Sequence, residues 1–320
     1  MQAIVVSEPG GADALVYRDR PDPAPGAGEV LVGVDAAGVN FIDVYHREGR
    51  YPLPTPFTPG AEGAGSVLAV GDGVSDVAVG DVVAWHQGPG SYAEKVVVGA
   101  DKVVKVPEGL DPKVAAAVML QGVTAHYLSA STYPVNEGDV AVVHAAAGGV
   151  GLLLTQMVKL RGGRVIATVS TEDKAKLARE AGADEVVGYE GFAAKVREFT
   201  GGKGAHVVYD GVGKSTFDEG LTALRTRGMM VLYGGASGAV GPFDPLKLSQ
   251  LGSLFLTRPT AGHYVLDRAE LEWRVGDLLR WIDEGRLSVR IGGTYPLSEA
   301  GRAHRDLEAR RTTGKLLLIP

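Results

Sequence analysis

The chain has 320 residues and no cysteine, with 45% hydrophobic residues, 22% charged residues and a formal net charge of −6. The lack of cysteine excludes disulfides, thiolate catalysis and cysteine-ligated structural zinc. The acidic balance, without a long basic run, disfavours nucleic acid as the main partner, because phosphate neutralisation needs clustered Lys and Arg. No run of about 18 apolar residues predicts a membrane span. The N-terminus does not resemble a secretory signal, so we expect a cytoplasmic location.

Residues 1–120 are predicted to form a β-rich domain. Short segments rich in Val recur there, and turn sequences such as PAPGAGE and GDGVSD separate them. The strand candidates are QAIVV (2–6), EVLVGVDAAGV (29–39), GSVLAV (65–70), DVVAWH (81–86) and YAEKVVV (92–98). Short strands at this spacing predict an antiparallel, barrel-like domain.

Residues 121–261 show a different rhythm, in which strands alternate with helices. The strand candidates are VAVVHA (140–145), RVIATV (164–169), EVVGY (185–189), HVVYDGV (206–212), MMVLYG (229–234) and SLFLT (253–257). The helix candidates are Val150–Arg161, Asp173–Ala181, Gly191–Phe199 and Ser215–Leu224. This alternation, with continuous apolar strands, predicts an α/β domain built on a doubly wound parallel sheet.

Residues 262–320 contain an amphipathic helix candidate, Leu266–Glu284, then a polar stretch and the apolar strand KLLLI at 315–319. A final strand needs a sheet to join. The sheet of the first domain is the reasonable candidate, so we expect 262–320 to complete the domain formed by 1–120.

A glycine-rich turn lies between the first two strands of the α/β domain. Residues 146–151 read AAGGVG, which has the spacing of the G-x-G-x-x-G fingerprint with Ala at the first position. These small residues permit a tight turn, a close approach of a pyrophosphate, and close packing of helix on strand. The helix expected near Gly149 would point free N–H groups at the phosphates. A glycine-rich corner without a ligand is the alternative, which the strand–turn–helix–strand setting disfavours.

The tip of the second strand of this domain discriminates between the two nicotinamide dinucleotides. An NAD site usually has an acid there, whereas this chain has Ser170 and Thr171. Ser170 with Asp173 also fits a helix capping box. Lys174 in the first helical turn would oppose the macrodipole and would be better placed beside a 2′-phosphate. The pattern therefore favours NADPH, although Glu172 or Asp173 could serve an NAD site.

Several motifs in order resemble the zinc-independent quinone oxidoreductases of the medium-chain dehydrogenase/reductase superfamily, the group that includes ζ-crystallin. The motifs are AGVNFID (37–43), PGAEGAG (59–65), GVTA (122–125), HAAAGGVG (144–151), VYDGVG (208–213) and GSLFLTRP (252–259). The resemblance implies a chaperonin-10-like catalytic domain made from both chain ends and a Rossmann domain in the middle. It also implies NADPH-dependent reduction of quinones or related conjugated carbonyls, and homodimers formed through the last Rossmann strand, Ser253 to Arg258.

Zinc-dependent alcohol dehydrogenases of the same superfamily have a cysteine where this chain has Asn40 and a histidine where it has Ala61. Without a Lewis acid, oxidation of an unactivated alcohol is hard, because nothing stabilises the alkoxide. A quinone is already electron-poor, and hydrogen-bond donors can stabilise its developing oxyanion.

The resemblance also implies site residues, without a metal. The catalytic candidates are Asn40, Asp43, Tyr51 and Thr124. Asn40 would lie near the nicotinamide and donate to the acceptor oxygen, or it could serve its own turn. Asp43 could orient neighbours or cap a helix, and Tyr51 could bind a flat acceptor or merely pack. The expected cofactor-binding residues are Asn40, Thr124, Ala147, Gly148, Gly149, Val150, Ser170, Lys174, Tyr189, Gly211, Gly234, Ser237 and Lys315.

One departure from the family pattern and two alternative functions remain open at this point. Gln121 stands where close relatives can carry a lysine that reaches the active site. An enoyl-thioester reductase of the same superfamily would use the same cofactor. A non-enzymatic NADPH-binding structural or RNA-binding protein is the alternative of another class, and the acidic charge argues against RNA.

Overall fold

The chain folds into two compact units. The computed structural model describes residues 1–86, 88 and 90–320. The first unit comprises Met1–Val123, Val265–Gly285 and Val289–Pro320, and the second comprises Thr124–Tyr264 and Arg286–Ser288. The C-terminal part of the chain therefore returns to the unit with which the chain begins.

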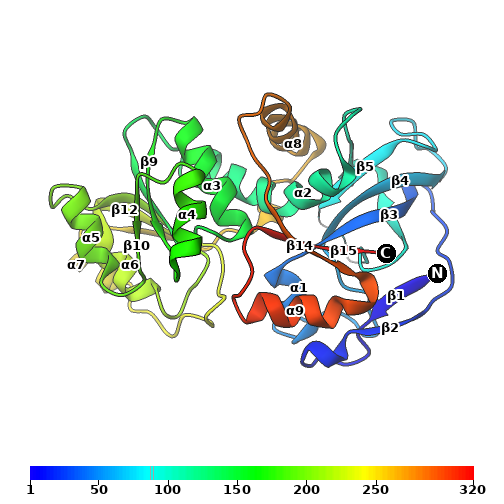
Figure 1. The fold of residues 1–320 in the computed structure, drawn as a ribbon, viewed down its shortest axis with the longest axis horizontal. Helices are drawn as coiled ribbons and strands as arrows, with labels where there is room; N and C mark the ends of the chain where they lie inside the picture. The colour runs from blue at the N-terminus through cyan, green and yellow to red at the C-terminus, as the bar shows by residue number, and fades with distance from the viewer. Residues whose placement is uncertain (87, 89) are drawn as a thin grey trace. The chain divides into compact units, whose positions relative to one another are not determined.

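The first unit is built on a seven-stranded sheet with the order β14-β15-β3-β4-β5-β7, in which β6 also pairs with β3. Its strands, with a separate antiparallel β1–β2 pair, are β1 (Gln2–Val5), β2 (Val16–Asp19), β3 (Glu29–Val39), β4 (Glu62–Val70), β5 (Val82–His86), β6 (Lys95–Gly99), β7 (Val103–Lys105), β14 (Ile291–Pro296) and β15 (Lys315–Ile319). The C-terminal strand β15 pairs antiparallel with β3, which confirms that the last strand joins this sheet (Figure 1).

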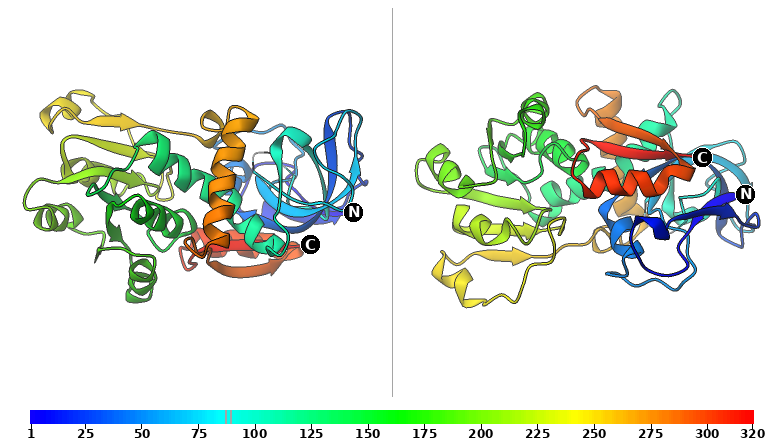
Figure 2. Two further views of the ribbon diagram at one scale, coloured as in Figure 1. Left: turned by 90° about the horizontal axis from the view of Figure 1, so that it is seen from above. Right: turned by 60° about the horizontal axis from the view of Figure 1, so that its bottom comes forward.

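The helices of the first unit lie between and beside these strands. They are η1 (Ala12–Ala14), α1 (Phe41–Arg47), η2 (Ala100–Lys102), the part of α2 (Pro112–Tyr127) up to Val123, α8 (Arg268–Asp283), η5 (Leu297–Glu299) and α9 (Ala300–Glu308). Helix α9 packs beside β14 and β15 (Figures 1 and 2). Ala300 and Ala303 of this helix enter a core with Val30, Trp85 and Leu316. The stretch expected to be only polar after residue 285 thus contains a strand and a helix.

The second unit has a six-stranded parallel sheet with the order β10-β9-β8-β11-β12-β13. The strands are β8 (Val140–Val143), β9 (Arg164–Thr168), β10 (Glu185–Val187), β11 (Ala205–Asp210), β12 (Leu224–Leu232) and β13 (Phe255–Thr257). Numbered within the unit, this order is 3-2-1-4-5-6, that of the Rossmann fold. All four residues of β8 are buried, as expected for a strand covered on both faces.

Two pairs of helices cover the two sides of this sheet (Figure 1). Helices α3 and α4 pack on each other, with α3 on β8 and β9 and α4 on β10, whereas α5 packs on α6, and α6 packs on β11 and β12. The helices of the unit are η3 (Leu128–Thr132), α3 (Gly149–Leu160), α4 (Glu172–Glu180), α5 (Phe192–Phe199), α6 (Phe217–Ala223), α7 (Leu246–Gln250) and η4 (Ala261–His263). Across the described residues of both units, no helix has the length and apolar character that a membrane crossing requires.

Candidate active site

A glycine-rich turn joins β8 to α3. Helix α3 begins at Gly149, with Gly148 as its N-cap residue. A Cβ atom at Gly151 would lie 2.7 Å from the Cα of Ala146, so the helix can approach the end of the strand this closely only with glycine there. The first N–H groups of α3 have no acceptor inside the helix and can bind an anion. The predicted residues of this turn are Ala147, Gly148, Gly149 and Val150.

Ser170 and Lys174 lie together just beyond β9. The Nζ atom of Lys174 is 3.4 Å from the Oγ atom of Ser170. Thr171 is the N-cap of α4, because it directly precedes the first helical residue and its Oγ1 accepts from the N–H of Lys174. The prediction that Ser170 forms a capping box with Asp173 is therefore wrong. The ammonium of Lys174 stands in the first turn of α4, where it opposes the macrodipole.

Tyr189 lies at the start of the glycine-rich turn. Its Oη accepts a hydrogen bond from the N–H of Ala145 at 3.1 Å, and its ring stacks on His144 with centroids 6.2 Å apart. A ring nitrogen of His144 lies 2.7 Å from Oγ1 of Thr168. Burial lowers the pKa of His144 to about 4, so this ring is neutral near pH 7. Tyr189 and the neutral ring of His144 together stabilise the start of the glycine-rich turn.

The loops that follow β11 and β12 approach each other closely. A Cβ atom at Gly234 would lie 2.9 Å from the Cα of Gly211. Oγ of Ser237 donates to the carbonyl of Val212 at 2.8 Å and accepts from the N–H of Ser215 at 3.1 Å. These loops, the glycine-rich turn and the tip of β9 all lie at carboxyl ends of parallel strands, where open α/β sheets bind ligands.

Two further predicted residues are described within their own units. Thr124 lies in the second half of α2 and is 9% exposed. Tyr51 follows α1, is 46% exposed, and packs edge-on against Tyr45 with ring centroids 5.8 Å apart. Tyr51 thus presents much of its surface outward, whereas Thr124 is nearly enclosed.

The first unit contains a buried polar cluster on the sheet face opposite its hydrophobic core. Trp85 and Leu316 point into that core. Side chains alternate along a strand, so their neighbours His86 and Lys315 point to the other face. Glu62 pairs with His86 across β4 and β5 and shares that face. The exposed fractions of His86, Glu62 and Lys315 are 2%, 0% and 1%, so this face holds three titratable side chains away from solvent.

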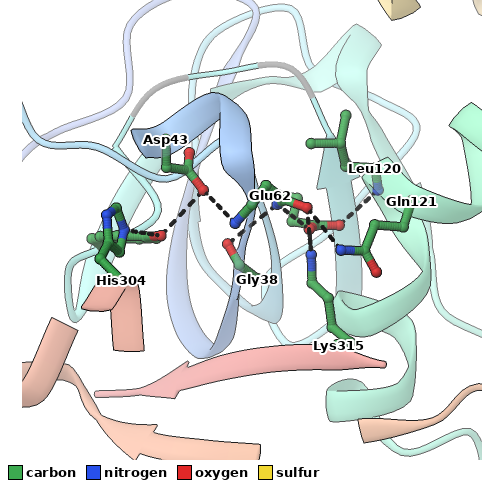
Figure 3. Close-up of polar contacts among 9 residues, drawn as sticks. Gly38, Asp43, Glu62, Leu120, Gln121, His304 and Lys315 are labelled. Atoms are coloured by element: carbon green, nitrogen blue, oxygen red, sulfur yellow. Dashed lines mark hydrogen bonds and ion pairs between the residues drawn. The ribbon is translucent and has the colours of Figure 1, made fainter. Parts of the chain in front are cut away.

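Glu62 and Lys315 form an ion pair above Gly38 (Figure 3). The second carboxylate oxygen of Glu62 accepts from the N–H of Leu120 at 2.6 Å. A Cβ atom at Gly38 would lie 2.5 Å from Cδ of Glu62 and 2.6 Å from Cε of Lys315, so the pair occupies the space that only glycine leaves. Burial lowers the pKa of Lys315, and the charge of Glu62 acts against that shift.

Asn40, which directly precedes α1, is held by both members of this pair. Its Nδ2 donates to Glu62 at 2.6 Å, and its Oδ1 accepts from Nζ of Lys315 at 2.8 Å. Gln121 donates to the same Oδ1 at 3.2 Å. A flipped amide would set oxygen against the carboxylate and nitrogen against the ammonium, so the two charges fix the orientation of Asn40. The amide of Asn40 was predicted to donate to the oxygen of the substrate. One of its two Nδ2 hydrogens points instead at Glu62.

A second chain of hydrogen bonds reaches the backbone of Asn40. Oδ2 of Asp43 accepts from the N–H of Asn40 at 2.9 Å, as the third residue of a helix does in a capping box. Tyr92 Oη lies 3.1 Å from the same oxygen and 3.0 Å from Nε2 of His304. Arg47 lies 3.2 Å from Nδ1 of His304. Arginine can only donate, so Nδ1 accepts, Nε2 carries the proton, and each donor points toward Asp43.

Burial shifts the titration of this chain. It raises the pKa of Asp43 to about 7 and, together with the charge of Arg47, lowers the pKa of His304 to about 3. The guanidinium of Arg47 also binds Glu308 through two contacts of 3.0 Å. Asp43 therefore caps α1 from a fully buried position, which matches the orienting and capping alternative rather than an exposed acid.

Two family models match this chain. The family model described as "Alcohol dehydrogenase GroES-like domain" matches residues 26–108, and the one described as "Zinc-binding dehydrogenase" matches residues 149–271. A quinone oxidoreductase of Pseudomonas aeruginosa is 46% identical, with 97% of each chain covered. The chain belongs to the quinone oxidoreductase family. It is an oxidoreductase of the medium-chain dehydrogenase/reductase superfamily, with a GroES-like domain and a Rossmann domain.

Solved structures of this family agree with the fold. The Escherichia coli quinone oxidoreductase complexed with NADPH is 40% identical with a TM-score of 0.98, and 100% of each chain is covered. A mycobacterial protein complexed with NADPH is 48% identical with a TM-score of 0.98, again over 100% of each chain. A 2-haloacrylate reductase of a Burkholderia species is 41% identical, with 100% of this chain and 99% of the relative covered.

The zinc in the name of one family model does not fit this quinone oxidoreductase family member. The chain has no cysteine, and its described residues contain no group of three or more His, Asp or Glu side chains arranged to hold a metal ion. The face that holds Asn40 instead carries the ammonium of Lys315.

Sequence reasoning did not identify several residues that organise the site. Glu62 and Gly38 lie inside quoted motifs but received no role, and Tyr92 and His304 were not singled out. Asp210 at the end of β11 was also missed, although its carboxylate binds the N–H groups of the next loop at 2.7 and 2.9 Å. A lone acid in a glycine-rich motif was the available signal for both Glu62 and Asp210.

Proposed function

We propose that the protein is an NADPH-dependent reductase that transfers hydride to quinones or related conjugated carbonyls without a metal. The observation that carries the cofactor choice is the pairing of Ser170 with Lys174 beyond β9 at 3.4 Å, where an NAD site has an acid. Two similar proteins, 40% and 48% identical, were solved with NADPH. The quinone oxidoreductases among the relatives support the acceptor class.

NADPH, when bound, supplies the hydride from its nicotinamide ring. The N-terminus of α3 would hold the pyrophosphate, and Ser170 and Lys174 would hold the 2′-phosphate. Tyr189 would contact the adenosine side of the cofactor. The remaining residues proposed to line its path are Thr124, Gly211, Gly234 and Ser237.

Asn40 is the proposed donor to the acceptor oxygen. Its Oδ1 accepts from Lys315 and Gln121, which draws electron density from the amide and strengthens its N–H groups as donors. One Nδ2–H donates to Glu62, and the other has a long contact of 3.5 Å to the carbonyl of Gly38, which a hydrogen bond to the acceptor oxygen would replace. We propose that Lys315 acts in this indirect way, through Asn40, in place of the direct cofactor contact expected from the resemblance. Tyr51 is the proposed surface against which a flat acceptor stacks.

Turnover by the purified protein tests this function. NADPH oxidation should be followed with 1,2- and 1,4-quinones, with enoyl thioesters and with 2-haloacrylate, and each reaction should be repeated with NADH. We expect the highest kcat/KM for a quinone with NADPH. A lack of NADPH-dependent quinone turnover across the panel would contradict the proposal.

Conjugated carboxylates are the second candidate acceptors, because a relative at 41% identity is named a 2-haloacrylate reductase. Hydride addition to a carbon–carbon double bond next to a carbonyl also builds negative charge on oxygen, so the same donor would serve. A higher kcat/KM for 2-haloacrylate or an enoyl thioester than for every quinone would select this candidate.

We also propose a homodimer formed through β13, within the predicted Ser253 to Arg258 segment. This strand ends the order of the sheet, and Phe255 and Leu256 on it are 56% and 37% exposed. An apolar edge strand of this kind needs a cover. Light scattering should give twice the chain mass of 33.3 kDa. Leu256→Lys should give the monomer mass, whereas Leu246→Lys, at an exposed position of α7, should not.

A further inference from the structure

Gln121 carries an acceptor atom without a partner beside the proposed site. Its Nε2 donates to Oδ1 of Asn40 at 3.2 Å. Its Oε1 is buried and has no hydrogen-bond partner among the described residues. Figure 3 shows the amide nitrogen of Gln121 on the side of the hydrogen bond and the oxygen turned away from it.

The orientation of this amide follows from the charges on its neighbours. Glu62 and Lys315 fix Asn40 with its oxygen toward Gln121, as argued above. A flipped Gln121 would set two oxygens against each other and lose the hydrogen bond. Oε1 of Gln121 therefore points away from Asn40. The ion pair sets this orientation of the Gln121 amide through Asn40.

A buried acceptor without a donor destabilises the folded protein, so most buried acceptors in native proteins are paired. Among the described residues, the side chain of Gln121 forms one hydrogen bond, through its nitrogen. Oε1 of Gln121 is an uncharged hydrogen-bond acceptor. It therefore favours a ligand with an O–H or N–H group and does not attract a carboxylate.

We propose that Oε1 of Gln121 accepts a hydrogen bond from a hydroxyl of the reduced product. This rests on the proposed function. A quinone receives two electrons and one hydrogen nucleus with the hydride, and one proton from water completes the hydroquinone, so two carbonyl oxygens become two hydroxyls. A quinone has no O–H group that could donate a hydrogen bond to Gln121. Such a donor forms only when the carbonyl oxygen is protonated. Gln121 is thus a group that favours the product side and the protonation that leads to it.

The test compares two ligands on four proteins: the wild type, two variants of Gln121 and one control. Binding of a hydroquinone and of its dimethyl ether, which lacks the hydroxyl hydrogens, should be measured by calorimetry with the NADP⁺-loaded enzyme. The protein change is Gln121→Met, with Gln121→Ala as the variant that removes the same oxygen without adding bulk. Gln250→Met is the matched control, because Gln250 is exposed at the end of α7.

The wild type and the control should prefer the hydroquinone over the ether by roughly tenfold, the ratio that a net hydrogen bond of about 1.4 kcal/mol gives. Both Gln121 variants should lose most of this preference, with NADPH affinity unchanged. The hydroquinone-to-ether affinity ratio of each Gln121 variant is divided by that of the wild type. This division removes the steric effect of the methyl groups, because every protein experiences it.

An unchanged preference in the Gln121 variants would overturn the proposal. So would a loss confined to NADPH affinity, because the donor would then belong to the cofactor. If neither ligand binds the wild type, the proposal also fails, whereas the proposed function is judged separately by turnover of the wild-type protein with quinones.

Discussion

Lys315 and Glu62 form a fully buried ion pair although 253 residues separate them in the sequence. The exposed fractions of the two side chains are 1% and 0%. Burying two charges is expensive, and the attraction between them compensates only when further hydrogen bonds satisfy the remaining atoms. Here Asn40 and the N–H of Leu120 supply those bonds. The pair thereby ties the last strand of the chain to the turn that carries Asn40.

Removal of one charge from this pair should be more harmful than removal of both. Lys315→Met leaves the Glu62 carboxylate buried and unpaired, which we expect to cost about 3–5 kcal/mol of unfolding free energy. Glu62→Gln should cost a similar amount for the opposite charge. The double variant should be clearly more stable than the sum of the two losses predicts. Urea unfolding of the four proteins measures this, and simple additivity would contradict the coupling.

Gly38→Ala should disturb the same pair without changing a charge. The added Cβ would lie 2.5 Å from Cδ of Glu62 and 2.6 Å from Cε of Lys315. Overpacking of this kind typically costs about 1–3 kcal/mol, and turnover should fall because Asn40 loses its anchors. Gly276→Ala is the control, since this exposed helical glycine has no atom within 4 Å of an added Cβ. Alanine in the helix should leave stability unchanged or raise it by up to about 1 kcal/mol. Equal stability of the two variants would show that the space above Gly38 is not filled.

The parallel sheet could be predicted because its strands are continuous apolar runs separated by helices of ordinary length. Among the described residues, four α-helices were not predicted, namely α1, α2, α7 and α9. Helix α2 is buried on most sides, with Ala115 and Met119 among its fully buried residues, so it lacks an amphipathic period. Periodicity detects a helix only when one face is apolar and the other is not. Helix α9 does turn Ala300, Ala303 and Leu307 toward the core, but it is short and mostly polar in composition.

The residues proposed to bind the cofactor lie closer together in the sequence than the residues around Asn40. The glycine-rich turn and Lys174 lie within one βαβ segment, where short spacing carries the information. The partners of Asn40 come from β4, α2 and β15, and spacing says nothing about contacts between Glu62, Gln121 and Lys315. Local patterns also left one ambiguity unresolved, since Ser170 and Thr171 are both good N-cap residues and only the start of α4 selects Thr171.

The buried carboxyl of Asp43 should give the protein an unusual pH dependence of stability. Burial raises its pKa from 3.8 to about 7, so the folded state holds this proton more tightly than the unfolded state does. The resulting stabilisation is complete below about pH 4 and is lost as the pH rises through 7. Relative to Asp43→Asn, the wild type should lose up to about 4 kcal/mol of unfolding free energy between pH 4 and 8.

Urea unfolding of the wild type and Asp43→Asn across this pH range measures the difference. His304, whose pKa is depressed to about 3, makes both proteins less stable in acid, and that contribution largely cancels. Asp72→Asn, which removes a carboxyl at an exposed position, is the matched control. A constant difference for Asp43→Asn would mean that this carboxyl titrates normally in the folded protein.

Lys174 should determine the preference for NADPH over NADH. Its ammonium lies 3.4 Å from the hydroxyl of Ser170 beyond β9. A cation in the first turn of α4 opposes the macrodipole, and a 2′-phosphate beside it would offset that cost. Lys174→Ala should weaken NADPH binding by roughly 10-fold, about the 1.4 kcal/mol expected of a charge-assisted hydrogen bond, and should leave NADH binding nearly unchanged. Fluorescence titration of each cofactor gives both dissociation constants. Lys176→Ala changes the same charge two residues along the same helix at an exposed position. The preference for NADPH should survive in that variant, and an equal loss in both variants would reduce the effect of Lys174 to net charge alone.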